Sequence, residues 1–347
     1  MRREELQFAR PTELFASAPP ERRHGQRDAV RLLVSGRDSE RHARFRELPE
    51  YLRRGDLLVV NNSATIAASL PTESRLGPIL LNFSTRFTSQ LWLAEPRWSA
   101  ARPGPLPLRE GEELRTGGGR LRLVAAYPGI PRLWFVRGDR PIADELRSSA
   151  GPIHYGYAPA YPLDVYQTLF STAPGSSEMP SAARPFTPEL CARLRDAGVG
   201  LSSVTLHTGV SSLEIESSEV EQQALYPEPF EVSAATARAV NATRARGGRI
   251  VAVGTTVVRA LESAWTRSGL RASRGFTRLF VHPAVGVRAV DGLLTGLHDP
   301  FTSHLALLAA IGGLDRVRRA YEVAIRARYR WHEFGDSHLL WGAHAGG

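Results

Sequence analysis

The chain has 347 residues, of which 42% are hydrophobic and 23% charged, a composition typical of a globular protein with one to three domains. Its formal net charge is +9, and all 44 basic residues are arginine. The absence of lysine excludes a Schiff base to pyridoxal phosphate and a Walker-type phosphate loop. The single cysteine, Cys191, excludes a disulfide framework and a cysteine-rich metal site.

The positive charge favours a polyanion such as RNA as a partner, although arginine-biased codon usage explains the charge equally well. The first residues, MRREELQFAR, contain no apolar signal-peptide core, and the longest apolar run, LALLAAIGGL, is too short to span a bilayer. We therefore expect a cytoplasmic protein that has no membrane contact.

The N-terminal part of the chain, residues 1–65, predicts a short helix or turn followed by two strands. The turn is expected in PTELFAS, and the strands in AVRLLVSG and GDLLVVNN. The run LLVV is continuous and partly β-branched, as expected for a buried strand. It ends at Asn61 and Asn62, which favour turns and offer side-chain hydrogen bonds.

Residues 66–149 have a different pattern, with short alternating runs between segments rich in glycine and proline. The runs are SQLWLAE, RLRLVAAY and RLWFVRG. Short strands at this spacing predict a small antiparallel β-barrel or sandwich, which we interpret as an inserted domain.

From residue 150 onward, strands alternate with helices. Helices are predicted in TPELCARLRDAGV, with a threonine cap and a glycine stop, in SAATARAVNATRARGG, in VVRALESAW, from about Ser303, and in LDRVRRAYEVAIRARY. Strands are predicted in SSVTLHTG, RIVAVGTT and TRLFVHP, before a closing FGDSHLLW. The alternation predicts an α/β domain with a mixed sheet, formed by residues 1–65 and 150–347 and interrupted by the barrel.

The segment RIVAVGTTVVRALES, residues 249–263, passes from a predicted strand into a predicted helix. Thr255 or Thr256 is expected to cap that helix and to leave N–H groups free for a carboxylate or phosphate. Arg259 and Glu262 project from one side, where Arg259 suits a carboxylate and Glu262 suits hydroxyls or an amine. The alternative is an ordinary capped helix with a surface ion pair.

The loop STAPGSSEMPSAARPFTPEL, residues 171–190, is a second candidate for ligand binding. Loops rich in glycine, serine and proline before a helix can wrap a nucleotide-like ligand with backbone groups. The loop contains no G-x-G-x-x-G motif, and a plain connecting loop explains it equally well.

Several titratable residues stand at predicted strand ends or turns. His207, His282 and His298 suit acid–base chemistry near neutral pH, although each alone is more often a structural histidine. Their spacing matches no metal motif, so no metal site is expected. Glu228 and Asp336 lie in turn-like settings, where each is either a base or a solvated turn residue.

Motifs across the chain follow the order of one family: LPEYLRRGDLLVVNNS, VYQTLFS, GSSEMPSAARPFT, VTLHTG, IVAVGTTVVRALES, LLTGLHDP and RYRWHEFGDSHLL. The chain resembles the S-adenosylmethionine:tRNA ribosyltransferase-isomerases of queuosine biosynthesis, the QueA family. The resemblance covers nearly the whole length, including the inserted barrel.

The resemblance implies an enzyme that consumes S-adenosylmethionine as a co-substrate and needs no metal. In that family, the ribosyl part of S-adenosylmethionine moves to the aminomethyl group of a 7-deazaguanine base in tRNA. Adenine and methionine leave, and the sugar becomes an epoxycyclopentane. Because a sulfonium acidifies the neighbouring C5′ protons, a carboxylate or histidine is expected to remove one of them.

The resemblance also implies the residues of the site. The candidate catalytic residues are His207, Glu228, His298 and Asp336. The candidate residues for binding S-adenosylmethionine are Asn61, Asn62, Gly175, Ser176, Pro180, Gly254, Thr255, Thr256, Arg259 and Glu262.

Some family positions are changed in this chain. The family loop G-S-V-A-A-P-T-A-G-L-H-F-T has a histidine where this chain has Pro185, which cannot carry a proton. The family segment H-x-M-H-S-E corresponds to QALYPE, residues 223–228, in which both histidines are lost and Glu228 remains. The losses cluster while the strand–helix frame survives, which indicates a retained S-adenosylmethionine pocket and a rebuilt acceptor side.

Glu178, Tyr226 and His304 are candidate replacements for the lost groups. Two alternatives to the family reaction on tRNA stay open. One is a divergent enzyme that activates S-adenosylmethionine for a small-molecule acceptor, and the other is a non-catalytic protein of the same fold that binds S-adenosylmethionine or nucleic acid.

Overall fold

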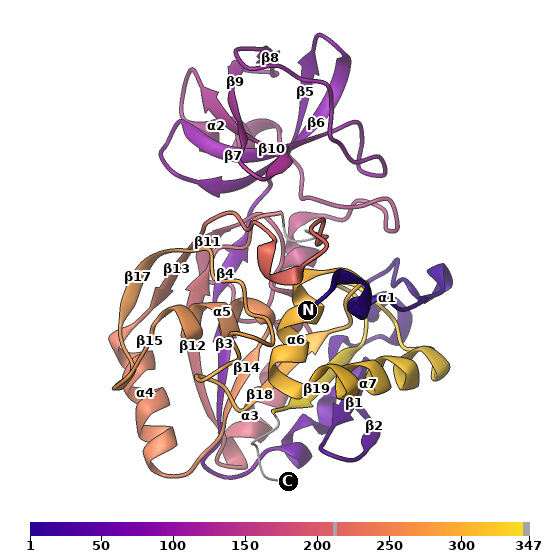
Figure 1. Cartoon of the computed structure of the whole chain (residues 1–347), viewed down its shortest axis with the longest axis vertical. Coiled ribbons are helices and arrows are strands. Elements are labelled where there is room, and N and C mark those ends of the chain that lie inside the picture. The colour runs from indigo at the N-terminus through magenta and orange to yellow at the C-terminus, as the bar shows by residue number, and fades with distance from the viewer. Residues whose placement is uncertain (211–213, 343–347) are drawn as a thin grey trace.

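The computed structural model describes residues 1–210 and 214–342, which form a large α/β lobe with a small β-barrel at one end of the long axis (Figure 1). The large lobe contains a nine-stranded sheet in the order β17-β13-β12-β3-β14-β18-β19-β1-β2. Its strands are β1 (Arg31–Ser35), β2 (Glu40–Arg44), β3 (Leu57–Asn61), β12 (Gly200–Leu206), β13 (Glu228–Val232), β14 (Ile250–Val253), β17 (Ser273–Thr277), β18 (Gly292–Gly296) and β19 (Ser337–Trp341). The predicted mixed sheet is confirmed.

The middle of the sheet consists of the parallel strands β12, β3, β14 and β18, with antiparallel pairs at β12–β13, β13–β17, β18–β19 and β1–β2. All residues of β3 and β14 are buried, which explains their continuous apolar sequences, because both faces of such strands are covered. The carboxyl ends of parallel strands meet at one edge of a sheet. The motifs NNS, LHTG, VGTT and LTGLH therefore gather there, although they are far apart in the sequence.

Helices cover both faces of the sheet (Figure 1). They are α3 (Pro188–Asp196), α4 (Ala234–Ala245), α5 (Thr255–Ser263), α6 (Ser303–Gly312) and α7 (Leu314–Arg326), with a short α1 (Pro20–His24) near the N-terminus. The predicted cap of α3 is confirmed, since Thr187 Oγ1 accepts a hydrogen bond of 3.2 Å from the Leu190 N–H. Apolar residues of α4–α7 pack in one core cluster with β3, β12 and β14, whereas α3 packs in another.

The inserted segment forms a closed barrel in the order β10-β7-β6-β5-β8-β9, as predicted. Its strands are β5 (Ser69–Ser74), β6 (Gly77–Arg86), β7 (Leu91–Arg97), β8 (Glu113–Arg115), β9 (Arg120–Tyr127) and β10 (Ile130–Gly138), followed by helix α2 (Ile142–Ser149). The barrel has its own apolar core, which includes Phe83, Leu93 and Val136. Domain boundaries at residues 66 and 149 enclose these elements and stay a prediction.

Shorter elements connect the barrel to the sheet. β4 (Ser63–Thr65) pairs in parallel with β11 (Ala173–Ser176), and β15 (Trp265–Thr266) pairs with β16 (Gly269–Leu270) after α5. The 3-10 turns are at Arg3–Leu6, Thr12–Leu14, Arg27–Ala29, Phe45–Tyr51, Leu163–Tyr166, Ser181–Ala183 and Val220–Gln222. Within the described part of the chain, no helix combines the length and apolar character that a membrane crossing requires.

One predicted strand is wrong. The segment TRLFVHP was expected to be a strand, but β17 ends at Thr277 and the following residues leave the sheet. The Leu279 N–H is held by Thr277 Oγ1 at 3.0 Å, and its carbonyl accepts a hydrogen bond from Arg259 Nε. The apolar side chains of this segment pack beside α5 and not against a neighbouring strand.

Candidate active site

The central cavity, of about 180 Å³, lies where the carboxyl ends of the parallel strands meet the connection from the barrel. Its lining includes residues 177–182 after β11, residues 254–256 at the start of α5, residues 295–299 after β18, Thr208 and His304, and a wall formed by Ile153, Tyr155, Tyr157, Tyr166, His332 and Glu333. The two segments singled out in the sequence therefore meet at one cavity.

Two further cavities adjoin it. The side cavity, of about 40 Å³, shares Thr208, Thr255, Thr256 and His304 with the central cavity and reaches Arg259 and Glu228. The barrel-side cavity, of about 690 Å³, lies between the barrel and the sheet and shares Thr65 with the central cavity. Its lining includes Gly175, His207, Arg86, Arg147, Trp92 and Phe276.

Helix α5 starts at the central cavity with an open N-terminus. The expectation that Thr255 or Thr256 caps the helix is wrong, because the N-cap is Gly254 and no side chain caps the helix. Gly254 has φ 100°, a conformation that favours glycine. The Thr256 hydroxyl instead accepts a hydrogen bond of 3.2 Å from Asn61 Nδ2. The N–H groups of the first helical turn are the natural partners for an anionic group in this cavity.

Asn61 and Asn62 hold neighbouring strands together and line none of these three cavities. The buried Asn61 amide donates to the Leu206 carbonyl at 2.8 Å and accepts from the N–H groups of Ser63 and Leu206 at 3.0 and 3.1 Å. Asn62 Oδ1 accepts a hydrogen bond of 2.7 Å from the Thr205 hydroxyl. Both asparagines therefore position the site from behind.

Ser63, which the sequence analysis did not single out, joins Ser176 and His207 in a buried hydrogen-bond chain. The Thr208 N–H donates to Ser176 Oγ at 3.0 Å, and Ser176 Oγ donates to Ser63 Oγ at 2.7 Å. Ser63 Oγ then lies 2.7 Å from His207 Nδ1. Burial lowers the pKa of His207, so its ring is neutral, and the chain of donors assigns its proton to Nε2.

Gly175 lies against the imidazole of His207. A Cβ on Gly175 would lie 2.6 Å from Cε1 and Nδ1 of that ring, closer than van der Waals contact allows. A side chain at this position would therefore displace His207.

Glu228 and Arg259 form a buried ion pair beside the side cavity. Glu228 is the first residue of β13 and is only 3% exposed, so the expected turn-like setting is wrong. The Gly209 N–H donates to Glu228 Oε1 at 2.9 Å, and Arg259 donates to Glu228 Oε2 and, at 3.0 Å, to the Leu279 carbonyl. Arg259 is thus already paired within the protein.

His298 and His304 meet at the cavity from separate elements. His298 follows β18, and its Nε2 lies 2.9 Å from Thr295 Oγ1, while its N–H donates to the Tyr321 hydroxyl at 3.1 Å. Burial, and then the nearby histidines, lower the pKa of His298 well below its usual value. Burial, and then Arg259, lower the pKa of His304 to about 4. Both imidazoles are therefore neutral at physiological pH.

Glu262 and Asp336 lie outside the lining of these cavities, and their contacts are structural. Glu262 Oε1 accepts hydrogen bonds of 2.6 Å from the N–H groups of Arg288 and Ala289. Asp336 accepts from the Arg31 N–H at 2.8 Å and the Arg330 N–H at 2.7 Å. These carboxylates fix loops that surround the site.

The match to known proteins decides the family. The family described as queuosine biosynthesis protein matches residues 3–340. The chain belongs to this family. It is 38% identical to the S-adenosylmethionine:tRNA ribosyltransferase-isomerase of Anaeromyxobacter sp. (strain K), over 98% of this chain and 99% of that protein. The protein of the same name from Deinococcus radiodurans is 37% identical over 96% of this chain and 94% of its own length.

A solved structure agrees with this assignment. The crystal structure of S-adenosylmethionine tRNA ribosyltransferase from Thermotoga maritima is 29% identical, with a TM-score of 0.55 over 96% of this chain and 99% of that chain. The resemblance inferred from the motifs and the predicted fold class are both confirmed.

Within the queuosine biosynthesis family, the candidate replacement residues of this chain lie at the cavities. His304 lines both the central and the side cavity, and Glu178 lines the central one. Tyr226 lines the side cavity, is 4% exposed, and donates a hydrogen bond of 2.6 Å to the Val210 carbonyl. Pro185, at the position of a family histidine, is buried.

The sequence analysis missed the aromatic wall of the central cavity. The Tyr155 hydroxyl donates to Glu178, and the Tyr157 hydroxyl donates to Glu333. The Tyr157 ring stacks on His332 with centroids 4.3 Å apart and planes 24° apart. The only local signal was the aromatic content of HYGY and WHEFGD, which are about 180 positions apart and show no shared spacing.

No group of three or more His, Cys, Asp or Glu side chains within residues 1–210 and 214–342 is arranged to hold a metal ion. The acid–base groups at the cavities are thus the neutral histidines and the carboxylates described above.

Proposed function

We propose that this protein is an S-adenosylmethionine:tRNA ribosyltransferase-isomerase of queuosine biosynthesis. In this proposal it moves the ribosyl part of S-adenosylmethionine to a 7-aminomethyl-7-deazaguanine base in tRNA and releases adenine and methionine. The observation that carries the proposal is the family match over residues 3–340, supported by relatives of that name at 37–38% identity over nearly the whole chain. A tRNA substrate implies that the protein works in the cytoplasm, with no metal taking part.

The central cavity is the proposed site for S-adenosylmethionine. The open N-terminus of α5 suits the methionine carboxylate, because unpaired N–H groups and the helix dipole favour an anion there. Pro180 and Gly254 line the same cavity and bring backbone groups close to the ligand. Asn61, Asn62, Ser176 and Glu262 support this wall from outside the cavity.

His298 is the proposed base for the C5′ proton. A neutral imidazole has a free electron pair, and burial keeps His298 in that form. The proton moves from C5′ to the ring, and the electron pair left on carbon is stabilised by the adjacent sulfonium. The low pKa of His298 makes the imidazolium a strong acid, so it passes the proton on readily.

The barrel-side cavity is the proposed site for the acceptor base. Trp92 and Phe276 offer aromatic faces, and Arg86 and Arg147 offer positive charge, the combination that single-stranded RNA favours. Thr65 lines both this cavity and the central one, so an amine on the base has a short path to the activated sugar. In this arrangement the barrel domain, residues 66–149, forms one wall of the acceptor site and the remaining α/β domain carries the chemistry.

Product analysis with two kinds of tRNA tests the proposal. Purified protein and S-adenosylmethionine are incubated with tRNA that carries the aminomethyl-deazaguanine base, or with the same tRNA carrying guanine. Adenine and methionine should appear only with the modified tRNA. Release without tRNA would favour a small-molecule acceptor, and a lack of S-adenosylmethionine binding by calorimetry would leave only the fold.

A further inference from the structure

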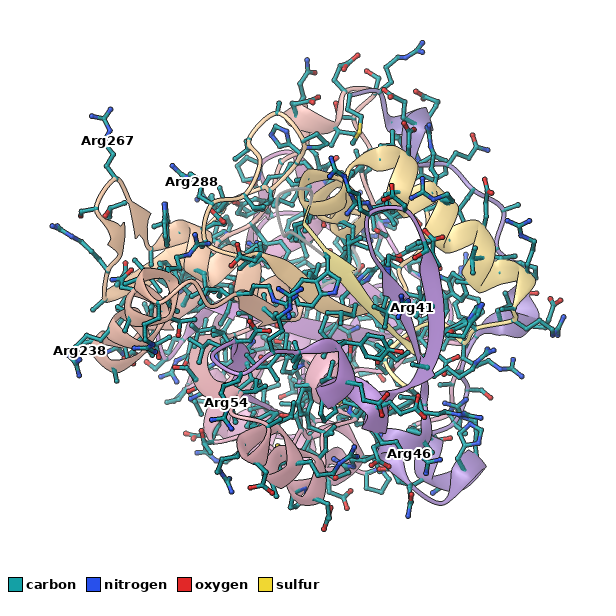
Figure 2. All side chains as sticks on the ribbon, turned by 90° about the horizontal axis from the view of Figure 1, so that it is seen from below. Arg41, Arg46, Arg54, Arg238, Arg267 and Arg288 are labelled. Atoms are coloured by element: carbon teal, nitrogen blue, oxygen red, sulfur yellow. The ribbon has the colours of Figure 1, made fainter. Side chains whose placement is uncertain are left out.

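The charge of the central cavity is opposite to that of the chain. The formal net charge of the protein is +9, yet the charged side chains in the lining, histidines aside, are the carboxylates Glu178, Glu214, Asp299 and Glu333. Among the described residues of this lining there is no arginine. Figure 2 shows arginines at the end of the molecule away from the barrel, where labelled side chains such as Arg46 and Arg267 extend outward from the ribbon.

Two of these carboxylates belong to one wall of the cavity, which we name the acid–aromatic wall and define as Tyr155, Tyr157, Glu178 and Glu333. The Tyr155 phenol donates to Glu178, and the Tyr157 phenol donates to Glu333. The two rings stack with centroids 6.2 Å apart and planes 24° apart. A phenol satisfies a carboxylate oxygen but leaves its negative charge uncompensated.

Asp299, across the same cavity, is compensated in a different way. Its Oδ1 lies 2.8 Å from Arg10 Nε, and its Oδ2 lies 3.1 Å from His332 Nε2. The acid–aromatic wall therefore contributes more net negative charge to the cavity than Asp299 does. Thr208, which lines the cavity and is 6% exposed, has a buried hydroxyl with no hydrogen-bond partner among the described residues. This hydroxyl is a second polar group that a ligand would satisfy.

We propose that the acid–aromatic wall binds the sulfonium end of the co-substrate and makes the central cavity selective for ligands with a net positive charge. This inference rests on the proposed function. Aromatic faces attract onium cations through the ring quadrupole, and carboxylates add a direct Coulomb attraction. The open N-terminus of α5 borders the same cavity, so the carboxylate and the sulfonium of one ligand meet groups of opposite charge.

The same charge favours product release. S-adenosylmethionine carries a net positive charge, whereas methionine and adenine carry none. The attraction that holds the co-substrate is therefore lost once the carbon–sulfur bond breaks and the sulfonium becomes a neutral thioether.

Calorimetry with three ligands of similar shape tests the inference without tRNA. S-adenosylmethionine and sinefungin are cationic, whereas S-adenosylhomocysteine has a neutral thioether. We expect the wild type to bind both cations about tenfold more tightly than the thioether. Glu333→Gln keeps an acceptor for Tyr157 and should weaken binding of both cations about tenfold while changing thioether binding less than about threefold. Glu178→Gln gives the same test at the second carboxylate, should either variant fold poorly.

The matched control is Glu322→Gln on α7, an exposed carboxylate 3.6 Å from Arg326, which should leave all three affinities unchanged. Equal wild-type affinity for the cations and the thioether, or an equal loss for all three in Glu333→Gln, would overturn the inference. If such a protein still released adenine with modified tRNA, the proposed function would stand alone. Binding of none of the three ligands would overturn both.

Discussion

The imidazole rings of His298 and His304 stack with centroids 4.6 Å apart and planes 21° apart, beside the central cavity. One ring follows β18 and the other is in the first turn of α6, so the pair joins two elements of the large lobe. A charge on either ring would face the other in a buried setting, which is why both remain neutral.

Replacing His298 tests its proposed role as the base. His298→Gln should lower kcat about a hundredfold, the usual contribution of a positioned base, with less than about a threefold change in S-adenosylmethionine affinity. His42→Gln is the matched control, because His42 lies on β2 and contacts Tyr329 away from the cavities. Equal losses of kcat and affinity in His298→Gln would point to a structural role, and so would an unchanged kcat.

A third buried histidine, His338 of β19, predicts a loss of stability in acid. His338 is fully buried, its Nε2 lies 2.8 Å from Ser35 Oγ, and burial lowers its pKa from 6.5 to about 4. Between these values the unfolded chain binds a proton that the folded chain does not, so the free energy of unfolding falls as the pH is lowered from about 6.5 to about 4. This group alone should remove on the order of 3 kcal/mol, measurable by urea unfolding across that range. His338→Gln should flatten this part of the profile, and an unchanged slope would contradict the assignment.

Much of the site could be predicted from the sequence, because strand ends are visible locally. Continuous apolar runs predicted β3 and β14, and parallel strands place their carboxyl ends at one edge of the sheet. That reasoning brought Gly254 and His298 to one cavity, as the structure confirms. The cap of α5 was wrong, because threonine is a good N-cap by composition, whereas the backbone turn here needs the positive φ of Gly254.

The rest depends on contacts between distant segments, which leave no local pattern. Tyr157 meets Glu333 only because the connection from the barrel packs beside the segment that precedes β19. Ser63 joins His207 through packing of β4 near the end of β12. Asp336 resembles a site carboxylate in sequence, yet its oxygens are occupied by backbone N–H groups. Side-chain partners of this kind follow from tertiary packing and not from periodicity.

The ion pair of Glu228 and Arg259 predicts a strong asymmetry between single and double variants. Arg259→Met leaves a buried carboxylate without its charge partner and should lower the free energy of unfolding by about 3–5 kcal/mol. Glu228→Gln combined with Arg259→Met removes both charges and should recover most of that loss. Urea unfolding of the wild type, both single variants and the double variant measures the coupling. A double variant as unstable as the sum of the single variants would contradict a buried, paired charge.

The contact between Gly175 and His207 predicts that a single methyl group impairs turnover. Gly175→Ala places a Cβ 2.6 Å from the ring and should displace it from Ser63, with about a tenfold loss of kcat/KM for tRNA. Gly151→Ala is the matched control, because a Cβ there meets no atom within 4 Å. Wild-type kinetics in Gly175→Ala would show that the position of His207 does not matter for the reaction.

Arg86, at the end of β6, tests whether RNA occupies the barrel-side cavity. Its guanidinium lies 5.9 Å from the centroid of the Trp92 ring, so charge and an aromatic face stand together. Arg86→Gln should weaken tRNA binding about three- to tenfold and reduce the dependence of log K on log salt by about one phosphate contact. S-adenosylmethionine affinity should be unchanged, since Arg86 is absent from the lining of the central cavity. Arg267→Gln removes an equal charge from the turn between β15 and β16, a position labelled in Figure 2. Because counterion release at that position involves no bound phosphate, the salt slope of this control should match the wild type, and equal slopes in both variants would place the RNA elsewhere.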